Sequence, residues 1–382
     1  MAPPSLAPLN VSHDDNGSMS EEELDGDNLD EDDTFISCHT DLPEVVEKLR
    51  AQLLSGYTCP NHPSLNHNYQ SHSLDSVEKL SLKHYIAWVD SHGTVKAYKL
   101  HAQVLKEATH VEILSLYMVR KLATEITGLS SQLVDMCPKS CMAFTGEFKD
   151  DTICTYSRDK KKPCGQLRYD INGKPRAQMV YTPITPIIQS FYKNYEMAKN
   201  MRYRHNQLQK AVQKLQPNSP PTAYSDFSDS IAHPQHVHEL NLFRKETDTA
   251  ITISGDGAQL TMKKQSDVWV LIVTILNLPP SMRYKATNII TPLVIPGPSS
   301  PGNVESFVYI LYEELAKLSV GIWTWDALSN QYFRLRVFLC GVLRDMLGSA
   351  KLSKMAGHMA VYGCRFSTVQ GACSSKEKGI NA

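Results

Sequence analysis

The sequence of 382 residues predicts a multidomain chain of mixed α+β or α/β class, with helices in its first half and a mixed β-sheet in its last third. Apolar residues recur three and four positions apart over much of residues 42–136 and 187–215, a spacing typical of helices. Beyond residue 250, short β-branched or fully apolar runs bounded by Gly and Pro are typical of strands. We expect, in order, a disordered acidic tail over 1–41, a helical region over 42–136, a cysteine-rich module over 137–180, a basic helix and linker over 181–238, and a sheet domain over 239–382.

The near-neutral net charge of the whole chain combines an acidic N-terminal tail with a basic remainder, the body, residues 48–382. The whole chain has 39 Lys and Arg against 40 Asp and Glu, a formal net charge of -1. Residues 1–47 hold 14 of the acidic residues and no Lys or Arg, which leaves 26 acidic against 39 basic residues in 48–382. The tail has too few apolar residues to fold by itself. An excess of 13 positive charges on the body favours polyanionic partners.

The helical region is expected to contain at least three helices. A short one begins at Leu42 and ends at Gly56, and a second has Asp75 as its N-cap. Helical spacing then continues over 100–134. The aliphatic and aromatic residues along these helices are expected to form the core of a small helical domain.

Four cysteines form a candidate metal site. Cys137 and Cys141 lie four residues apart, and Cys154 and Cys164 follow in a stretch rich in Gly, Lys and Asp. Four thiolates can complete a tetrahedral Zn²⁺ shell and hold together a segment too small for its own core. The interval from Cys154 to Cys164 is wider than a regular zinc ribbon would have, so four ordinary cysteines remain the alternative.

Two groups of basic residues are candidate contacts to a nucleic-acid backbone. One lies between Cys154 and Cys164, and the other lies on the long helix expected over 187–215, which has six basic residues and one acid. A solvated loop and a solvated helix face are the plain alternatives to phosphate contact. The candidate DNA-binding residues are Arg158, Lys160, Lys161, Lys162, Lys199, Arg202 and Arg204.

Residues 250–343 are expected to form three strands, a helix and a fourth strand. The strands are expected over 250–254, 269–276, 288–295 and 333–343. Pro292 predicts that the third strand lies at the sheet edge, and Asn303 and Gly321 are expected to cap the helix. A right-handed crossover would return the fourth strand beside the first and parallel to it. An RNase H-like sheet begins in this order, here incomplete.

This order predicts that two aspartates meet at one end of adjacent strands. Asp256 follows the first strand and Asp345 the fourth. Two neighbouring carboxylates can hold Mg²⁺ or Mn²⁺, and such a site can activate a water or a 3′-hydroxyl for phosphodiester displacement. An Asp-Gly turn at 256 and a helix cap at 345 are the alternatives.

Several motifs of the sequence resemble the large transposases of CACTA (En/Spm-type) DNA transposons. They are CPKSCMAFTGEF from Cys137, KNYEMAKNMRYR from Lys193, GDGAQL from Gly255, LNLPPSMRYK from Leu276, VIPGPSSPGNVESFVYILYEEL from Val294, and RDMLGSAKL through GHMAVYGCRF near the end. Together they cover about residues 130–373. The combination is specific to the family, whereas a single motif would not be.

The resemblance implies that Asp256 and Asp345 are two carboxylates of a DDE catalytic triad, and that the cysteine module is a zinc-ribbon-like insertion. Ser157 stands where the family often has a cysteine, which leaves Cys164 as its displaced substitute. The third carboxylate has no match before the end of the printed sequence, because Glu377 lies in a stretch without apolar residues. We therefore expect a truncated or degenerate DNA transposase with little strand transfer of its own.

The resemblance also implies a nuclear protein that binds double-stranded DNA at transposon ends and self-associates. The alternative function is a non-catalytic DNA-binding or interaction protein derived from a transposase. The longest apolar stretch, 269–278, is far short of the ~20 residues of a membrane span, and the first residues lack the basic start and apolar core of a secretory signal. We therefore expect neither a membrane partner nor secretion.

Overall fold

A computed structural model describes residues 42–63, 73–157, 162–214, 226–230, 233, 236–237, 240, 242–259, 267–343, 372–373 and 380–381. The predicted acidic tail, 1–41, lies outside this part of the chain. The chain divides into two units, Met1–Glu47 and Lys48–Ala382, and α1 (Leu42–Leu54) spans the boundary between them. Among the described helices, none has the length and apolar character needed to cross a bilayer.

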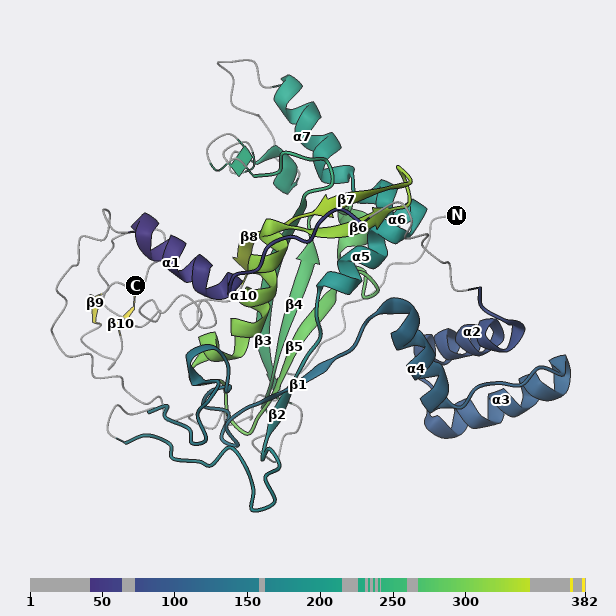
Figure 1. The fold of residues 1–382 in the computed structure, drawn as a ribbon, viewed down its shortest axis with the longest axis horizontal. Helices are drawn as coiled ribbons and strands as arrows, with labels where there is room; N and C mark the ends of the chain where they lie inside the picture. The colour runs from purple at the N-terminus through teal and green to yellow at the C-terminus, as the bar shows by residue number, and fades with distance from the viewer. Residues whose placement is uncertain are drawn as a thin grey trace, which may run out of the picture. The chain divides into compact units, whose positions relative to one another are not determined.

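Three helices follow the first one: α2 (Ser76–Asp90), α3 (Val95–Thr109) and α4 (Leu116–Thr127) (Figure 1). The side chain of Asp75 accepts a hydrogen bond from the backbone N–H of Glu78, and the Glu78 side chain accepts one from the backbone N–H of Asp75. This reciprocal pair satisfies two donors that the first turn of α2 would leave without partners. The prediction of Asp75 as an N-cap is therefore confirmed.

The expected helical spacing up to residue 134 is wrong at its end. The backbone of Gly128 has a φ of 69°, a left-handed conformation that a residue without Cβ adopts at low cost, and α4 ends there. Residues Gln132–Asp135 form the short strand β1 instead. The apolar residues expected on one helix therefore belong to a helix, α4, and to a strand, β1.

The main sheet has six strands in the order β1-β2-β5-β4-β3-β8. The strands after β1 are β2 (Gln178–Tyr181), β3 (Thr249–Gln259), β4 (Asp267–Ile275), β5 (Ile290–Pro296) and β8 (Val337–Leu343). Neighbouring strands are antiparallel except β3 and β8, which are parallel. Figure 1 shows β3, β4 and β5 side by side at the centre of this sheet.

The predicted order of the central strands is confirmed. Three antiparallel strands, β3, β4 and β5, are followed by α10 (Val304–Val320), and the chain then returns as β8 beside β3. Asn303 caps α10 by accepting a hydrogen bond from the backbone N–H of Ser306, and Gly321 ends the helix with a φ of 117°. The single strand expected over 333–343 is two strands in the structure, because a hairpin of β6 (Ile322–Asp326) and β7 (Gln331–Leu335) precedes β8.

The prediction that Pro292 marks an edge strand is wrong. β5 lies between β4 and β2, which is contributed by a segment far upstream. Pro292 tolerates this position because it lies opposite Thr182, one residue beyond the end of β2. There its carbonyl accepts a hydrogen bond from the Thr182 N–H at 2.8 Å, and its missing N–H falls where the pairing stops.

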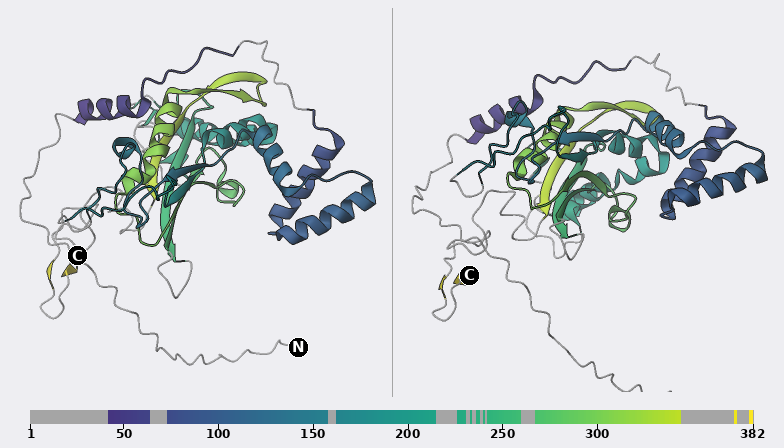
Figure 2. Two further views of the ribbon diagram at one scale, coloured as in Figure 1. Left: turned by 60° about the horizontal axis from the view of Figure 1, so that its bottom comes forward. Right: turned by 90° about the horizontal axis from the view of Figure 1, so that it is seen from below.

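One face of the sheet is covered by α10 and α5 (Thr185–Lys193). Phe307 and Leu311 of α10 belong to the same buried cluster as Ile251 and Ile253 of β3. Figure 2 shows α10 running along the strands. The Glu314 carboxylate joins α10 to α5, since it accepts hydrogen bonds from the first backbone N–H groups of α5, where negative charge is favourable. A second cluster, containing Phe243, Ala250 and Leu276, lies at the start of β3.

The single long helix expected over 187–215 is three helices in the structure. After α5, Asn194 adopts extended backbone and caps α6 (Tyr195–Asn200) by accepting a hydrogen bond from the Met197 N–H at 3.0 Å. The third helix is α7 (Tyr203–Lys214). The remaining elements are the 3-10 helices η1 (Gly146–Phe148) and η2 (Phe227–Asp229), the helix α9 (Pro280–Arg283), and the paired strands β9 (Ala372–Cys373) and β10 (Ile380–Asn381).

Candidate metal centre and the Asp256 end of the sheet

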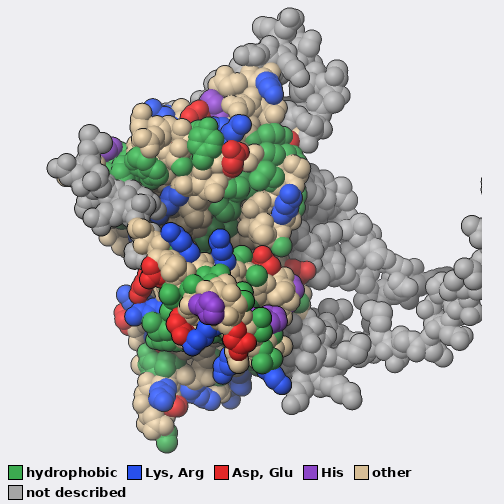
Figure 3. Space-filling model, turned by 90° about the vertical axis from the view of Figure 1, so that its right-hand side faces the viewer, with side chains coloured by type: hydrophobic (Ala, Val, Ile, Leu, Met, Phe, Trp, Pro, Cys, Tyr) green, Lys and Arg blue, Asp and Glu red, His purple; other side chains and the backbone are tan. Residues whose placement is uncertain are grey.

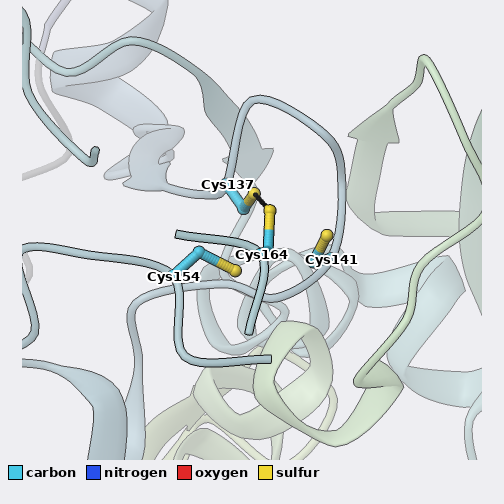
Figure 4. A group of neighbouring side chains, drawn as sticks. All are labelled: Cys137, Cys141, Cys154 and Cys164. Atoms are coloured by element: carbon cyan, nitrogen blue, oxygen red, sulfur yellow. Dashed lines mark hydrogen bonds between the residues drawn. The ribbon is translucent and has the colours of Figure 1, made fainter. Parts of the chain in front are cut away.

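The structure brings the four predicted cysteines together. The Sγ atoms of Cys137, Cys141, Cys154 and Cys164 all lie within 4.8 Å of one another, and those of Cys137 and Cys164 are 3.8 Å apart. Figure 4 shows the four side chains converging. Zinc–thiolate bonds of about 2.3 Å place the sulfurs of a tetrahedral site roughly 3.8 Å apart. The space between these sulfurs therefore suits a metal ion such as Zn²⁺.

The first two cysteines are held by a tight turn. The backbone N–H of Cys137 donates to the carbonyl of Met142, and the N–H of Ser140 donates to the carbonyl of Cys137, both at 2.8 Å. Ser140 has a φ of 55°, which reverses the chain so that Cys141 faces Cys137. The N–H of Lys139 points at the Cys137 sulfur at 3.4 Å, a donor that would stabilise a thiolate there.

The other two cysteines face each other across a hairpin-like pair of chain segments. The N–H of Cys154 donates to the carbonyl of Gln166, and the N–H of Cys164 donates to the carbonyl of Tyr156. Because this backbone pairing sets their positions, the number of residues between them has little influence on the distance between their sulfurs. The wide interval that made the site uncertain from sequence is thus compatible with a four-cysteine cluster.

The protonation of the cluster is uneven in the absence of a cation. A hydrogen bond from Cys141 lowers the pKa of Cys137 to about 5, and the same contact raises the pKa of Cys141. Burial raises the pKa of Cys154 to about 12. One thiolate stabilised by neighbouring thiols is what the geometry supports, and a divalent cation would favour loss of the remaining protons.

Asp256 lies within β3 and is exposed. The strand extends to Gln259, and Asp256 pairs with Val270 of β4. The alternative interpretation of Asp256 as part of an Asp-Gly turn is therefore wrong. Since side chains alternate along a strand and Ile251 and Ile253 face α10, Asp256 lies on the opposite face of the sheet.

The second aspartate, Asp345, lies outside the described residues. The last described pair of the parallel β3–β8 ladder joins Ser254 to Leu343. Asp256 follows Ser254 by two residues, and Asp345 follows Leu343 by two residues. The described pairs thus stop two residues short of both aspartates, and the pairing of Asp256 with Asp345 stays a prediction.

Two of the predicted DNA-binding residues are buried, which corrects the prediction for them. Arg202 is 5% exposed, and its guanidinium donates to Asp326 at 2.5 Å and to Glu246 at 3.3 Å. Arg204 is fully buried over the ring of Phe243. Both guanidiniums stabilise the packing of the helices on the sheet, and neither lies where a DNA phosphate would meet it.

The partners of Arg204 are all internal. One guanidinium nitrogen lies 3.0 Å from Nε2 of His233, and another donates to the carbonyl of Asp248 at 3.1 Å. The Asp248 carboxylate in turn binds Arg336. Basic residues are exposed by default, so the sequence contained no local signal of this burial.

The structure describes two of the five remaining predicted DNA contacts. Lys162 and Lys199 are exposed, whereas Arg158, Lys160 and Lys161 lie outside the described residues. On the face drawn in Figure 3, basic side chains alternate with acidic ones instead of forming one continuous basic patch. The formal excess of positive charge is therefore not concentrated on that face.

Sequence reasoning missed the residues that attach the cysteine module to the sheet domain. Ser306, in the first turn of α10, is buried, and its hydroxyl accepts a hydrogen bond from the N–H of Ala143 at 2.9 Å. Gly302 and Asn303 contact the carbonyls of the Cys137–Cys141 turn. The only sequence signal for these residues was the glycine and the cap at the start of a helix.

A family model matches the last part of the chain. The profile of a family described as transposase family tnp2 matches residues 229–379. This match supports a transposase-derived chain. It includes Asp256 and Asp345 and the strands from β3 to β8, but not the cysteine module. A search of curated proteins finds no match.

Proposed function

We propose that the chain is a DNA-acting protein derived from a transposase of the CACTA (En/Spm) type, built on an RNase H-like sheet. The observation that carries this proposal is the parallel pairing of β3 with β8, within the part of the chain that matches a transposase family. The paired register ends two residues before each aspartate. Double-stranded DNA is the proposed partner, self-association is a further expectation, and the nucleus is the proposed location.

Asp256 and Asp345 are the proposed ligands of Mg²⁺ or Mn²⁺. An exposed aspartate on a strand is accessible both to a hydrated cation and to a DNA phosphate, as a two-metal phosphodiester site requires. The bound ions would supply an activated water or 3′-hydroxyl and would stabilise the leaving oxygen. The role of the two carboxylates is to fix the ions at the end of adjacent strands.

The cysteine cluster is the proposed Zn²⁺ site, with a structural role. All four ligands are cysteines, and a closed four-cysteine shell has no open position for a substrate. The family resemblance implies a third catalytic carboxylate, and we assign none of the 382 residues to it. We therefore expect these residues by themselves to show little strand transfer.

A test of this function compares the purified chain with its Asp256→Ala and Asp345→Ala variants on a supercoiled plasmid with Mn²⁺. We expect duplex binding, at most weak nicking, and loss of that nicking in either variant. Nicking that is equal in the chain and both variants would contradict the assignment of the aspartates. Robust strand transfer by the unmodified chain would contradict the expectation of low activity.

The second candidate is a non-catalytic DNA-binding protein derived from a transposase. The excess of 13 positive charges on residues 48–382 and the exposed Lys162 and Lys199 favour it. Duplex binding that weakens with salt but is unchanged in both aspartate variants, with no nicking under any condition, would support this candidate over the first.

A further inference from the structure

The cysteine module leaves the sheet at the same end as Asp256. Asp256 pairs with Val270, Val270 with Val294, and Val294 with Val180, so a single row crosses β3, β4, β5 and β2. The module is the insertion between β1 and β2, whose facing ends are Asp135 and Gln178. Both of these residues lie beyond that row, on the side toward which β3 ends. The module and Asp256 thus share one end of the sheet.

At this end the module holds the connection between β5 and α10. The Ser140 hydroxyl donates to the carbonyl of Pro296 at 3.1 Å, where β5 ends. The N–H of Gly302 donates to the carbonyl of Ser140 at 3.2 Å, and the N–H of Asn303 donates to the carbonyl of Cys141 at 2.7 Å. The same turn that positions two of the cysteines therefore binds both ends of the 297–303 connection.

The module also forms hydrogen bonds and packing contacts with the first turns of α10. The Ser306 hydroxyl accepts from Ala143, and the Ser306 carbonyl accepts a hydrogen bond from Thr145. Gly146 lies against the ring of Tyr309, because an added Cβ there would be 2.9 Å from that ring. These contacts continue the hydrogen-bonded attachment along the helix for more than one turn.

Gly302 lies between the two cysteine-bearing segments. An added Cβ would be 2.8 Å from the carbonyl oxygen of Cys141 and 2.6 Å from Cε1 of Tyr156. Tyr156 belongs to the other segment, and its carbonyl accepts from the N–H of Cys164. A side chain at position 302 would thus push the attachment apart without replacing any of the four sulfur ligands.

Among the described residues, the module has only a small core between these two segments, although Tyr156 packs against it and Arg168 pairs with Asp135 at 2.8 Å. Its buried apolar cluster consists of Met142, Phe144 and three of the cysteines themselves. A core of this size does not fix a segment of about forty residues, and a closed metal shell supplies the missing constraint. Without a cation, the turn that accepts from Gly302 and Asn303 keeps only the small apolar cluster as its link to the segment that carries Cys154 and Cys164.

We infer that a Zn²⁺ ion at the four cysteines acts as a clamp that fixes the β5–α10 connection and the start of α10 at the Asp256 end of the sheet. The inference rests on the zinc site of the proposed function and is independent of any catalytic step. The metal stabilises a position of residues 297–306, and through α10 it stabilises the path by which the chain returns to β8. Loss of the metal loosens this end while the β3–β4 centre stays folded.

The test uses hydrogen exchange of the full chain loaded with Zn²⁺ alone and of the same chain after treatment with a chelator. Zinc content per chain is measured first, and one ion per chain is expected. Removal of zinc is expected to accelerate exchange in peptides covering residues 297–306 by about tenfold or more, because hydrogen bonds at the start of α10 open. Peptides from the centre of β3 and β4 are expected to exchange at the same rate in both samples.

A Gly302→Ala variant separates the clamp from the metal site. It is expected to bind one zinc per chain and yet to show the fast exchange over 297–306 that the stripped chain shows. Gly341→Ala is the matched control, because its added Cβ would meet Thr252 at 3.6 Å, an ordinary contact. A Cys154→Ser variant is expected to lose zinc, and a Cys59→Ser variant is expected to keep it.

Two results would overturn the inference. If no zinc binds, both the zinc site and the clamp are wrong. If zinc binds but its removal changes exchange only within the module, the zinc site stands and the clamp is wrong. Neither result depends on DNA cleavage, so failure of the proposed nuclease chemistry remains distinguishable from failure of the clamp.

Discussion

Ser254 of β3 and Leu343 of β8 are paired in a parallel ladder, so two strands that β4, β5, α10 and the β6–β7 hairpin separate along the chain run side by side in the same direction. The pairing includes an irregularity between Ile251 and Thr252, beyond which it is regular to Ser254. A parallel pair needs a long crossover, and α10 supplies it. The consequence is that residues placed equally far beyond this pair are expected to meet at one end of the sheet.

The first prediction concerns the coupling of Asp256 to Asp345. If both carboxylates bind the same cation, Asp256→Asn is expected to weaken Mn²⁺ binding by about tenfold or more, and Asp345→Asn to do the same. The double variant is expected to lose little further affinity, because residues that share one ligand are not additive. Mn²⁺ titrations followed by electron paramagnetic resonance measure the Mn²⁺ affinity of the unmodified chain, the two single variants and the double variant.

Asp90→Asn is the matched control for this cycle, because Asp90 is exposed and lies at the end of α2, outside both the sheet and the cysteine module. It should leave Mn²⁺ affinity unchanged. Strictly additive losses in the double variant would show that the two aspartates bind separate ions or none, and the shared site would then be wrong.

The second prediction concerns the buried pair of Asp248 and Arg336. The Asp248 carboxylate is fully buried and accepts from Nε of Arg336 at 2.9 Å and from the N–H of Lys245 at 2.9 Å. Asp248→Asn leaves Arg336 without its counter-ion and is expected to lower the free energy of unfolding by about 3 kcal/mol. The loss stays at the low end of the range for buried pairs, because the Arg336 side chain is 23% exposed.

Urea denaturation measures this change. The comparison is Glu125→Gln, which breaks an exposed pair with Lys121 at 3.8 Å, where about 0.5 kcal/mol or less is expected. Equal losses in the two variants would mean that burial at Asp248 adds nothing, which contradicts the structural role assigned to this network.

The elements that the sequence predicted correctly depend on local patterns. α10 has an N-cap and a C-terminal glycine on either side of an apolar face, and the central strands are short runs bounded by turns. The four cysteines were found because they are the residue type with the fewest alternative uses in such a small segment. Their convergence did not depend on a regular spacing, since the backbone pairing of Cys154 and Cys164 with their opposite segment sets the geometry.

The features that the sequence did not reveal depend on distant partners. Nothing near Pro292 indicates that β2 pairs with its strand, because β2 lies far upstream, directly after the cysteine module. In the sequence, Arg202 and Arg204 have the pattern of a basic helix face. In the structure, Arg202 donates to the Asp326 carboxylate and Arg204 to the Asp248 carbonyl, two acceptors that are distant in sequence. Gly302 looks like an ordinary turn glycine, and only the docked module explains why a side chain has no room there.

The third prediction concerns pH and the buried His233. Burial, together with the nearby charge of Arg204 and the neighbouring His236 and His205, lowers the pKa of His233 to about 3. A histidine in the unfolded chain has a pKa of about 6.5. Between pH 6.5 and pH 3, His233 therefore binds a proton in the unfolded chain but not in the folded chain. The stability that depends on neutral His233 is therefore complete above pH 6.5 and is lost progressively as the pH falls toward 3.

The expected slope from this residue is about 1.4 kcal/mol per pH unit between pH 6 and pH 4. Urea denaturation at several pH values should show a shallower dependence for His233→Gln than for the unmodified chain, whatever its effect at pH 7. His101→Gln replaces an exposed histidine and should leave the slope as it is. A slope that persists in His233→Gln would assign the pH dependence to other groups.

The fourth prediction concerns DNA binding by the exposed lysines. Lys162 lies in the cysteine module and Lys199 in α6, and both are exposed. Each lysine that contacts a phosphate contributes about 0.9 to the slope of log affinity against log salt, because it releases condensed counterions. The double variant Lys162→Gln, Lys199→Gln is therefore expected to bind duplex DNA with a slope smaller by almost 2, measured by fluorescence anisotropy in roughly 50–200 mM KCl.

Lys106→Gln is the control, since Lys106 is already paired with Glu112 at 2.6 Å and its loss should leave the slope unchanged. An equal slope in the double variant and the unmodified chain would place the DNA contact elsewhere, because the slope counts the phosphates that the protein neutralises.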